Sequence, residues 1–322
     1  MIAASPMSVI AQAAQWLRSG QRVVLVTLTG FEISTPRATG SLMVVCEDGR
    51  SHGSLSSGCV EQAIVAEALD ALQAGHGHRR RYGVGSPFLD IRLPCGGGMD
   101  LLFTPLDDPS VVEAALGALQ DRRAVGLCLG AGAASLRQAG PDKAGWQDED
   151  FIIPLIPALR LLVFGQGEEL LALARLAHGY GTQVAAFSPQ DSDVQALAGL
   201  GAATVRLESL QRIPPIPSDG WSAIIFLFHE RDWEEALLAA TLSAPAFYHG
   251  AVGSARTHAS RLRRLQQQGV SAGAIERLRG GIGLIPATRD PATLALSILA
   301  EVAGAYAALP RHAAACPALD MA

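Results

Sequence analysis

Continuous apolar runs and helical repeats alternate over the first 130 residues of the chain. Strands are predicted where apolar residues follow one another between turns, over 22–29, 41–46, 89–93, 99–103 and 124–129. Helices are predicted where Ala and Leu recur at helical spacing among polar residues, over 9–18, 62–74 and 111–120. We therefore expect a mixed α/β domain over residues 1–130.

The second half of the chain alternates strands and helices more regularly. Buried strands are predicted over 159–164, 183–187, 203–207 and 223–228, with helices after them and a last helix over 291–308. This alternation predicts a parallel sheet, so the fold class is α/β, with a Rossmann-like domain over 159–308. Residues 131–158, rich in Gly, Ala, Asp and Gln, are expected to be a connector, and 309–322 a flexible tail.

Composition narrows the class of protein. With 322 residues, 49% hydrophobic and 17% charged, the chain is long enough for two globular domains. A formal net charge of −5 argues against nucleic acid as a partner, and the absence of a long apolar window argues against a membrane span. The start lacks the features of a signal peptide, and the five cysteines include no C-x-x-C pair, which is typical of a reducing compartment. A cytoplasmic protein is expected.

Two cysteines occur at glycine-rich turns. Cys59 stands between Gly58 and a predicted helix start, where unpaired backbone N–H groups and the helix dipole favour the thiolate. Cys95 precedes Gly96 and Gly97 at a second turn. The alternative for each is a small buried hydrophobic side chain, which is the interpretation we give to Cys46 and Cys128 inside apolar strands.

Three arginine-containing segments are candidates for anion binding. Pro36 fixes the backbone beside Arg37 in the polar loop 30–40, and the guanidinium suits phosphate or carboxylate, with a surface salt bridge as the alternative. The basic run 76–81 is attributed to a solvated helix end rather than to an anion site. Glycines and Ser254 before the basic helix that starts near Arg256 form either an anion nest or an N-cap with a solvated basic face.

The turn after the strand 159–164 resembles the dinucleotide-binding fingerprint only in part. Gly165 and Gly167 occupy its first two glycine positions, whereas Leu170 stands at the third. Ser188-Pro189-Gln190 replaces the acidic ribose anchor expected at the end of the second strand. Glu168 and Glu169 place negative charge where a pyrophosphate is bound in that motif. The turn therefore favours the fold but argues against NAD(P).

Seven motifs in order along nearly the whole chain resemble the XdhC/CoxI family of accessory proteins for molybdenum hydroxylases. They are Ser34-Thr35-Pro36-Arg37-Ala38-Thr39-Gly40, Gly58-Cys59-Val60-Glu61, Pro94-Cys95-Gly96-Gly97, Phe228-His229-Glu230, the segment 248–254, Gly281-Ile282-Gly283-Leu284 and the segment 296–301. Departures from the family pattern are Ser57, Glu168, Leu170, Ala255 and Gly281, most of them in the second half.

The resemblance implies a two-domain protein, expected to be a homodimer, that binds molybdenum cofactor. Such a protein holds the cofactor while a terminal sulfur ligand supplied by a cysteine desulfurase is installed, and delivers it to an apo molybdenum hydroxylase such as a xanthine dehydrogenase. This is a maturation factor rather than a catalyst. The residues expected to contact the cofactor are Pro36, Arg37, Gly40, Gly58, Cys59, Glu61, Cys95, Gly96, Gly97, Gly165, Gly167, His229, Gly253, Ser254 and Arg256.

In this hypothesis Cys59 and Cys95 face the molybdenum or its sulfur, and Glu61 orients the site or accepts a hydrogen bond. The main alternative is an NAD(P)-dependent oxidoreductase that uses the second domain, with His229 as proton donor. A third interpretation is a scaffold that docks an apo-enzyme without holding the cofactor. A zinc site is disfavoured because no histidine lies at ligand spacing from either cysteine.

Overall fold

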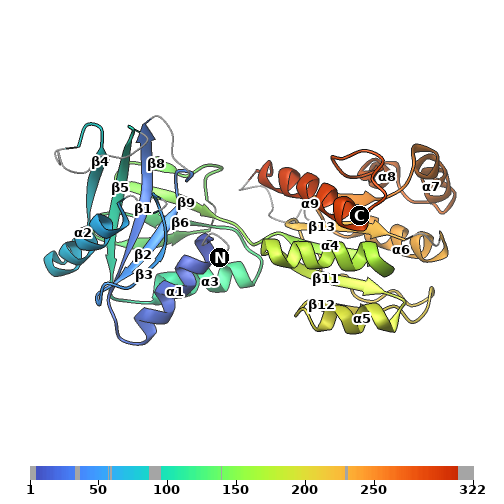
Figure 1. The fold of residues 1–322 in the computed structure, drawn as a ribbon, viewed down its shortest axis with the longest axis horizontal. Coiled ribbons are helices and arrows are strands. Elements are labelled where there is room, and N and C mark those ends of the chain that lie inside the picture. Colours follow the sequence, from blue (N-terminus) through green and yellow to red (C-terminus); the bar gives the residue numbers. More distant parts are fainter. Residues whose placement is uncertain are drawn as a thin grey trace. The chain divides into compact units, whose positions relative to one another are not determined.

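The computed structural model describes residues 5–32, 37–56, 58, 60–86, 96–138, 140–228 and 231–310. The chain divides into two compact units, Met1–Pro157 and Ala158–Ala322, each with its own sheets and cores (Figure 1). The fold prediction is confirmed: antiparallel sheets with helices make the first unit, and a parallel sheet makes the second. In the described ranges no helix is both long and apolar enough to cross a membrane.

The described part of the first unit is built on a sheet in the order β3-β2-β1-β5-β4. Its strands are β1 (Val23–Glu32), β2 (Leu42–Cys46), β3 (Ser51–Gly53), β4 (His78–Gly83) and β5 (Gly98–Leu106). All pairings are antiparallel, with β1 and β5 central. A β-bulge interrupts the pairing of β1 with β5 at Thr29, whose hydroxyl donates to the Asp100 carbonyl at 3.0 Å.

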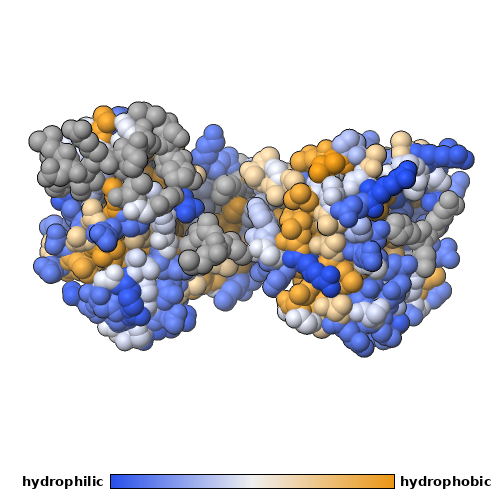
Figure 2. Space-filling view, viewed as in Figure 1, coloured by the Kyte–Doolittle hydropathy of each residue, from blue (hydrophilic) through white to orange (hydrophobic). Residues whose placement is uncertain are grey.

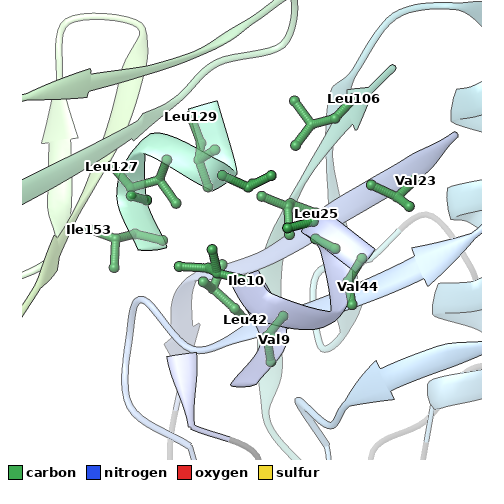
Figure 3. Packing of buried hydrophobic residues seen from close by; sticks show 14 of the residues in the cluster. Val9, Ile10, Val23, Leu25, Leu42, Val44, Leu106, Leu127, Leu129 and Ile153 are labelled. Carbon is green, nitrogen blue, oxygen red and sulfur yellow. The ribbon is translucent and has the colours of Figure 1, made fainter. Parts of the chain in front are cut away.

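Alternation of side chains across this sheet gives it a core on each face. One face packs against α2 (Glu61–Ala74) through β1 residues Val24 and Val26. The other face, with Val23 and Leu25, packs against α1 (Pro6–Arg18) and α3 (Ser110–Gln120). Figure 3 shows this second core, in which side chains of α1 lie among those of both sheets of the unit.

The stretch expected to be a connector, 131–158, instead contributes strands to the first unit. A second sheet has the order β7-β6-β9-β8, made of β6 (Val125–Leu129), β7 (Ala134–Arg137), β8 (Gly145–Gln147) and β9 (Asp150–Leu155). Burial of Phe151, Ile153 and Leu155 in the core with α1 and α3 holds β9 in place. Gly132, Gly140, Asp142 and Asp148 lie in the turns, and β7 and β8 are too short to show a periodic pattern.

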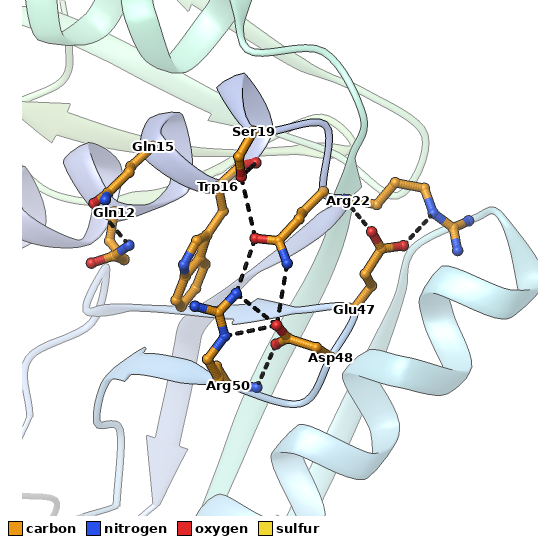
Figure 4. A network of polar contacts seen from close by, with 9 residues as sticks. Gln12, Gln15, Trp16, Ser19, Arg22, Glu47, Asp48 and Arg50 are labelled. Carbon is orange, nitrogen blue, oxygen red and sulfur yellow. Dashed lines mark hydrogen bonds and ion pairs between the residues drawn. The ribbon is translucent and has the colours of Figure 1, made fainter.

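The turn between β2 and β3 is fixed by polar contacts to the segment between α1 and β1 (Figure 4). The Asp48 carboxylate accepts from the Arg50 Nε at 2.7 Å and from the Gln21 side chain at 3.2 Å. The Arg50 guanidinium lies 5.3 Å from the centre of the Trp16 ring. Hydrogen bonds from the side chain and the backbone of Arg50 are the main reason that the pKa of Asp48 is lowered. This network stabilises one end of the sheet. The loops 33–41, 54–60 and 84–97 are attached at the opposite end.

The second unit contains, among its described residues, a parallel sheet in the order β12-β11-β10-β13-β14-β15. Its strands are β10 (Arg160–Gly165), β11 (Gln183–Ser188), β12 (Ala203–Arg206), β13 (Ser222–Leu227), β14 (Tyr248–Ala251) and β15 (Leu278–Gly280). The chain order reverses direction beside β10, so the carboxyl ends of β10 and β13 form a topological switch point.

Helices cover both faces of the parallel sheet. The helices of the unit are α4 (Gly167–Tyr180), α5 (Asp191–Ala198), α6 (Arg231–Ser243), α7 (Ala255–Gln267), α8 (Ala272–Glu276) and α9 (Pro291–Ala307). One core contains side chains of α4 and α9, and the other contains side chains of α6, α7 and α8. Some hydrophobic side chains remain at the surface over α4 and α9 (Figure 2). Pro291 at the start of α9 follows Asp290, which caps that helix.

The strands β4 and β14 also differ from the sequence-based expectation. The basic run was attributed to a solvated helix end, but His78–Gly83 is the edge strand β4. Its charged side chains conceal the strand in the sequence, and charge on an edge strand prevents further pairing. Tyr248–Ala251, expected only as part of a glycine-rich motif, is β14, buried along its length. The strand predicted over 89–93 lies outside the described residues.

Candidate functional site

Three of the motif loops leave the first sheet at the same end. The register places Gly98, at the start of β5, opposite Glu32 at the end of β1 and Gly83 at the end of β4. Leu42 starts β2 opposite Thr27, and Gly53 ends β3 opposite Met43. The loops 33–41, 54–60 and 84–97 therefore begin or end at one edge of the strands. Because β3 and β5 are separated by two strands, their ends lie about 14 Å apart, a span that loops of this length can cross.

The loop between β3 and α2 is organised by the carboxylate of Glu61, the first residue of α2. It accepts hydrogen bonds from the Ser54 hydroxyl at 2.7 Å, the Ser56 backbone N–H at 3.0 Å and the Ser56 hydroxyl. Burial opposes ionisation of Glu61, but these hydrogen bonds and one from the Gly58 backbone outweigh it and lower its pKa to about 2. Glu61 is thus ionised and directed at its own loop, where it orients Ser54 and Ser56.

The glycines of these loops have two kinds of environment. Gly58 has a φ of 107° and Gly96 a φ of 70°, and a Cβ atom on either would meet no atom of the described residues within 4 Å. They are needed for backbone conformation and leave space above the chain, which allows close approach of a ligand. Gly97 accepts a hydrogen bond from the Val84 N–H at 3.0 Å. Gly40 has a φ of 88° and faces Ala144, where a Cβ would lie 2.7 Å away, so its role is packing within the unit.

Arg81 fastens the strand ends from which two of the loops emerge. Its guanidinium is 2.9 Å from the Asp100 carboxylate on β5 and 2.7 Å from the Glu32 carboxylate on β1, and its Nε donates to the Val84 carbonyl at 2.8 Å. Arg81 therefore joins β1, β4 and β5 where they meet the loops 33–41 and 84–97. This role could not be predicted from the sequence, because the partners are distant in the chain and Arg81 lies in a run of three arginines.

Several residues expected at the site, Pro36, Cys59, Cys95 and His229, lie outside the described residues. Arg37 is described and lies half-buried in the loop between β1 and β2. The two cysteines that the structure describes are in the core, as predicted: Cys46 is 0% and Cys128 2% exposed. Burial raises the pKa of the Cys128 thiol, which makes it an unreactive side chain. Within the described ranges no three His, Cys, Asp or Glu side chains gather as metal ligands.

In the second unit the glycine turn after β10 has the backbone geometry of a dinucleotide-binding turn. A carboxylate of the chain is bound at this turn. Gly165 approaches β13 so closely that a Cβ would lie 2.9 Å from Leu227, and Gly167 has a φ of 74°. The Gly167 N–H donates to the Asp193 carboxylate at 3.0 Å, and Asp193 is 3% exposed. Leu170 is fully buried in the core between α4 and the sheet. The N–H group that faces a pyrophosphate in the fingerprint is therefore already bound by a carboxylate.

A crevice of about 1020 Å³ opens at the carboxyl ends of β10, β13, β14 and β15, in the position where open α/β sheets bind ligands. Phe228, Val252 and Ile282 give it apolar walls, and Gly253, Ser254, Thr257 and Arg289 contribute polar groups. Of the residues expected here, Gly253 and Ser254 line the crevice, and Ser254 also caps α7 by accepting from the Thr257 N–H at 3.2 Å. Arg256 is exposed and is not among the lining residues.

A buried ion pair forms one wall of this crevice. Arg261 on α7 is 1% exposed, and its Nη2 donates to Glu234 of α6 at 2.9 Å and to the Val252 carbonyl at 2.9 Å. The same nitrogen thus joins α6 to the end of β14. The sequence suggested a solvated basic face for α7, which is wrong for Arg261 because Glu234, 27 residues earlier, lies opposite it.

The segment after β15 is held by two residues of α9. The Glu301 carboxylate accepts from the Gly283 N–H and from the Tyr248 hydroxyl, the latter at 2.7 Å. The Ser297 hydroxyl accepts from the Ile285 N–H at 2.7 Å. Their spacing of four residues places both on the face of α9 that meets this segment. Ser297 and Glu301 therefore shape the rim of the crevice, together with Leu284 and Ile285, which are 64% and 44% exposed.

Comparison with known proteins identifies the family to which the chain belongs. A model of the XdhC and CoxI family matches residues 16–83, and a model of the XdhC Rossmann domain matches residues 161–302. The Escherichia coli (strain K12) protein named molybdenum cofactor insertion chaperone PaoD is 37% identical over 294 residues, which are 90% of this chain and 86% of PaoD. The chain belongs to the XdhC/CoxI family. The two XdhC/CoxI matches fall in separate units, so the division seen in the structure follows the family's own segments.

The XdhC/CoxI fold has also been seen in a crystal structure. The protein from Bacillus halodurans, named a xanthine dehydrogenase, has a TM-score of 0.73 to this chain at 18% identity, with 92% of this chain and 95% of that chain covered. At this identity the likeness shows that the two chains share a fold.

Proposed function

We propose that this chain is a molybdenum cofactor chaperone: it binds the cofactor, holds it for sulfuration and delivers it to an apo molybdenum hydroxylase of the xanthine dehydrogenase type. The observation that carries the proposal is the likeness to PaoD, which extends over 90% of the chain at 37% identity. Relatives this similar over both units share their fold and commonly their class of ligand. The family resemblance of the motif loops points in the same direction.

The cofactor is bound by the loops at the end of the first sheet. It is a pterin with a dithiolene, a phosphate and an oxidised metal centre, and it arrives as cargo rather than as a resident group. The positive φ angles of Gly58 and Gly96 suit close approach of the backbone to a flat ligand. Arg37 in the neighbouring loop supplies a guanidinium for the phosphate. The fit with the described residues is therefore good.

The two cysteines, Glu61 and Arg81 have different roles in this proposal. Cys59 and Cys95 contact the molybdenum or its sulfur, because soft thiolates suit such a centre. Glu61 does not contact the cofactor: its carboxylate is used by Ser54 and Ser56, and it holds the loop that presents Cys59. Arg81 keeps the ends of β1, β4 and β5 together beneath the loops. The chain itself performs no redox step.

The proposed chaperone function implies two protein partners. A chaperone of this kind meets an apo molybdenum hydroxylase as acceptor and a cysteine desulfurase as sulfur donor, and it acts in the cytoplasm as a homodimer. The NAD(P)-dependent oxidoreductase considered above is disfavoured, because Asp193 occupies the Gly167 N–H that a pyrophosphate needs.

Anaerobic gel filtration tests the proposal. The purified chain is mixed with isolated molybdenum cofactor, and molybdenum is measured in the protein peak. Co-elution is expected, followed by transfer when the loaded chain is added to an apo molybdenum hydroxylase. A chain that elutes without molybdenum but together with the apo-hydroxylase would show a scaffold instead, and a chain that retains neither would contradict the proposal altogether.

A further inference from the structure

All the residues that line the crevice belong to the second unit. The crevice is large, it lies at the switch point of a parallel sheet, and its lining includes both apolar and cationic side chains. We propose that it binds a nucleoside monophosphate, a single nucleotide with its phosphate on Arg289, and that it does not bind a dinucleotide.

The sheet topology limits the ligand to one nucleotide. In dinucleotide folds the two nucleotides lie on either side of the central strand, over the two halves of the sheet. Here the lining residues come from the turn after β10 and from the ends of β13, β14 and β15, and none of those described belongs to β11, α5 or β12. On that other side Asp193 is buried and bonded to Gly167 and to Ser188. One half of the crevice is therefore closed by protein groups.

The charges of the lining select where a phosphate binds. Arg261 and Arg264 already face Glu234 and Glu235. Arg289 lines the crevice, is exposed, and has no ion pair or hydrogen bond to any residue that the structure describes. A guanidinium in this state binds phosphate with paired, charge-assisted hydrogen bonds. The phosphate is therefore assigned to Arg289.

The remaining walls suit a base and a sugar. Phe228, Ile282 and Leu294 offer apolar surface, and the exposed Leu284 and Ile285 at the rim would be covered by a planar ring. Glu169 also lines the crevice, and its negative charge at the start of α4 disfavours a second phosphate there. This combination favours a phosphorylated nucleoside over inorganic phosphate and over a bare base.

Calorimetric titration of the full chain tests the assignment. The probes are the common ribonucleoside monophosphates, the corresponding nucleosides, inorganic phosphate and NADH. At least one monophosphate is expected to bind saturably and more tightly than its nucleoside, inorganic phosphate or NADH. Absence of binding by every monophosphate at millimolar concentration would overturn the proposal, as would NADH or inorganic phosphate binding equally tightly.

Two arginine variants locate the phosphate. Arg289→Gln is expected to weaken monophosphate binding by about tenfold or more, the loss of a charge-assisted hydrogen bond. Arg263→Gln is the matched control, because Arg263 is exposed on α7 and does not line the crevice. Equal binding by wild type and Arg289→Gln would refute the assignment. Cys59→Ala should leave nucleotide binding unchanged, which separates this site from the proposed cofactor site; loss of binding in that variant would contradict the proposal.

Discussion

The carboxylate of Asp193 accepts a hydrogen bond from the backbone N–H of Gly167 at 3.0 Å. It accepts a second bond from the Ser188 hydroxyl at 2.7 Å, so α5, β11 and the start of α4 are joined by one buried side chain. This contact occupies the group that would otherwise face a pyrophosphate. The unit therefore has the sheet and the glycine turn of a dinucleotide-binding domain, but its turn binds a carboxylate of the same chain.

Replacing Asp193 should destabilise the second unit. Asp193→Ala leaves the Gly167 N–H and the Ser188 hydroxyl without their acceptor, and we expect a loss of about 2–3 kcal/mol in the free energy of unfolding. Urea denaturation followed by circular dichroism measures it. Asp191→Ala is the control, because Asp191 makes only an exposed pair with Arg206 and should cost less than about 1 kcal/mol. Equal losses of unfolding free energy in both variants would show that the buried contacts of Asp193 stabilise the unit no more than the exposed pair of Asp191 does.

The Glu61 contacts predict a pH-dependent stability. The pKa of Glu61 is lowered from 4.5 to about 2 in the folded chain. Its contribution is therefore fully present above about pH 5 and is lost as the pH falls towards 2. After allowance for solvent screening, Glu61→Gln should reduce the unfolding free energy by about 1–2 kcal/mol at pH 7, and the difference should shrink at pH 3. Glu113→Gln, at an exposed pair with Arg18, is the control. A difference that grows on acidification would contradict the role given to Glu61.

The buried pair of Arg261 and Glu234 gives a third prediction. Either single substitution, Arg261→Met or Glu234→Leu, leaves one buried charge without its partner and should cost about 3–5 kcal/mol. The double variant should recover most of that loss, because neither charge remains. A double-mutant cycle on chemical denaturation measures the coupling. Additive losses would mean that the two side chains act independently, contrary to the geometry of the pair.

Two glycines near α9 should respond in opposite directions to alanine. Gly283 has a φ of 115°, and a Cβ there would lie 2.6 Å from the Ser297 hydroxyl oxygen, so Gly283→Ala should destabilise the unit by about 1–3 kcal/mol. Gly304 is inside α9 with nothing within 4 Å of its Cβ position. Gly304→Ala should therefore stabilise by up to about 1 kcal/mol. Thermal unfolding compares the two, and a stabilising Gly283→Ala would disprove the crowding argument.

The sequence predicted those features that depend on local patterns. The strands β10, β11, β12 and β13 were predicted because buried parallel strands are continuous apolar runs, and the turns at Gly58 and Gly167 because only glycine adopts their φ angles readily. The likeness of several separate motifs to one family was recognisable for the same reason.

Features that depend on distant partners could not be predicted. The strand β4 is concealed by its arginines, whose partners include Glu67 on α2, Asp100 on β5 and Glu32 on β1. The stretch 131–158, expected to be a connector, contains β7, β8 and β9. The strands β7 and β8 are too short to show a periodic pattern, whereas β9 is a continuous apolar run that the sequence analysis missed. Asp193 had no recognisable signal in the sequence, and Arg261 was interpreted only as part of a solvated basic face. The role of each depends on the residue that it contacts.

The central claim is that the chain holds molybdenum cofactor through the loop that Glu61 organises. The most direct test is the molybdenum retained per chain after anaerobic gel filtration with the cofactor, measured for wild type, Cys59→Ala and Cys128→Ala. Cys128 is buried in β6 and serves as the matched thiol. The account predicts that Cys59→Ala loses most of the molybdenum while Cys128→Ala retains the wild-type amount. Wild-type loading of Cys59→Ala would contradict it.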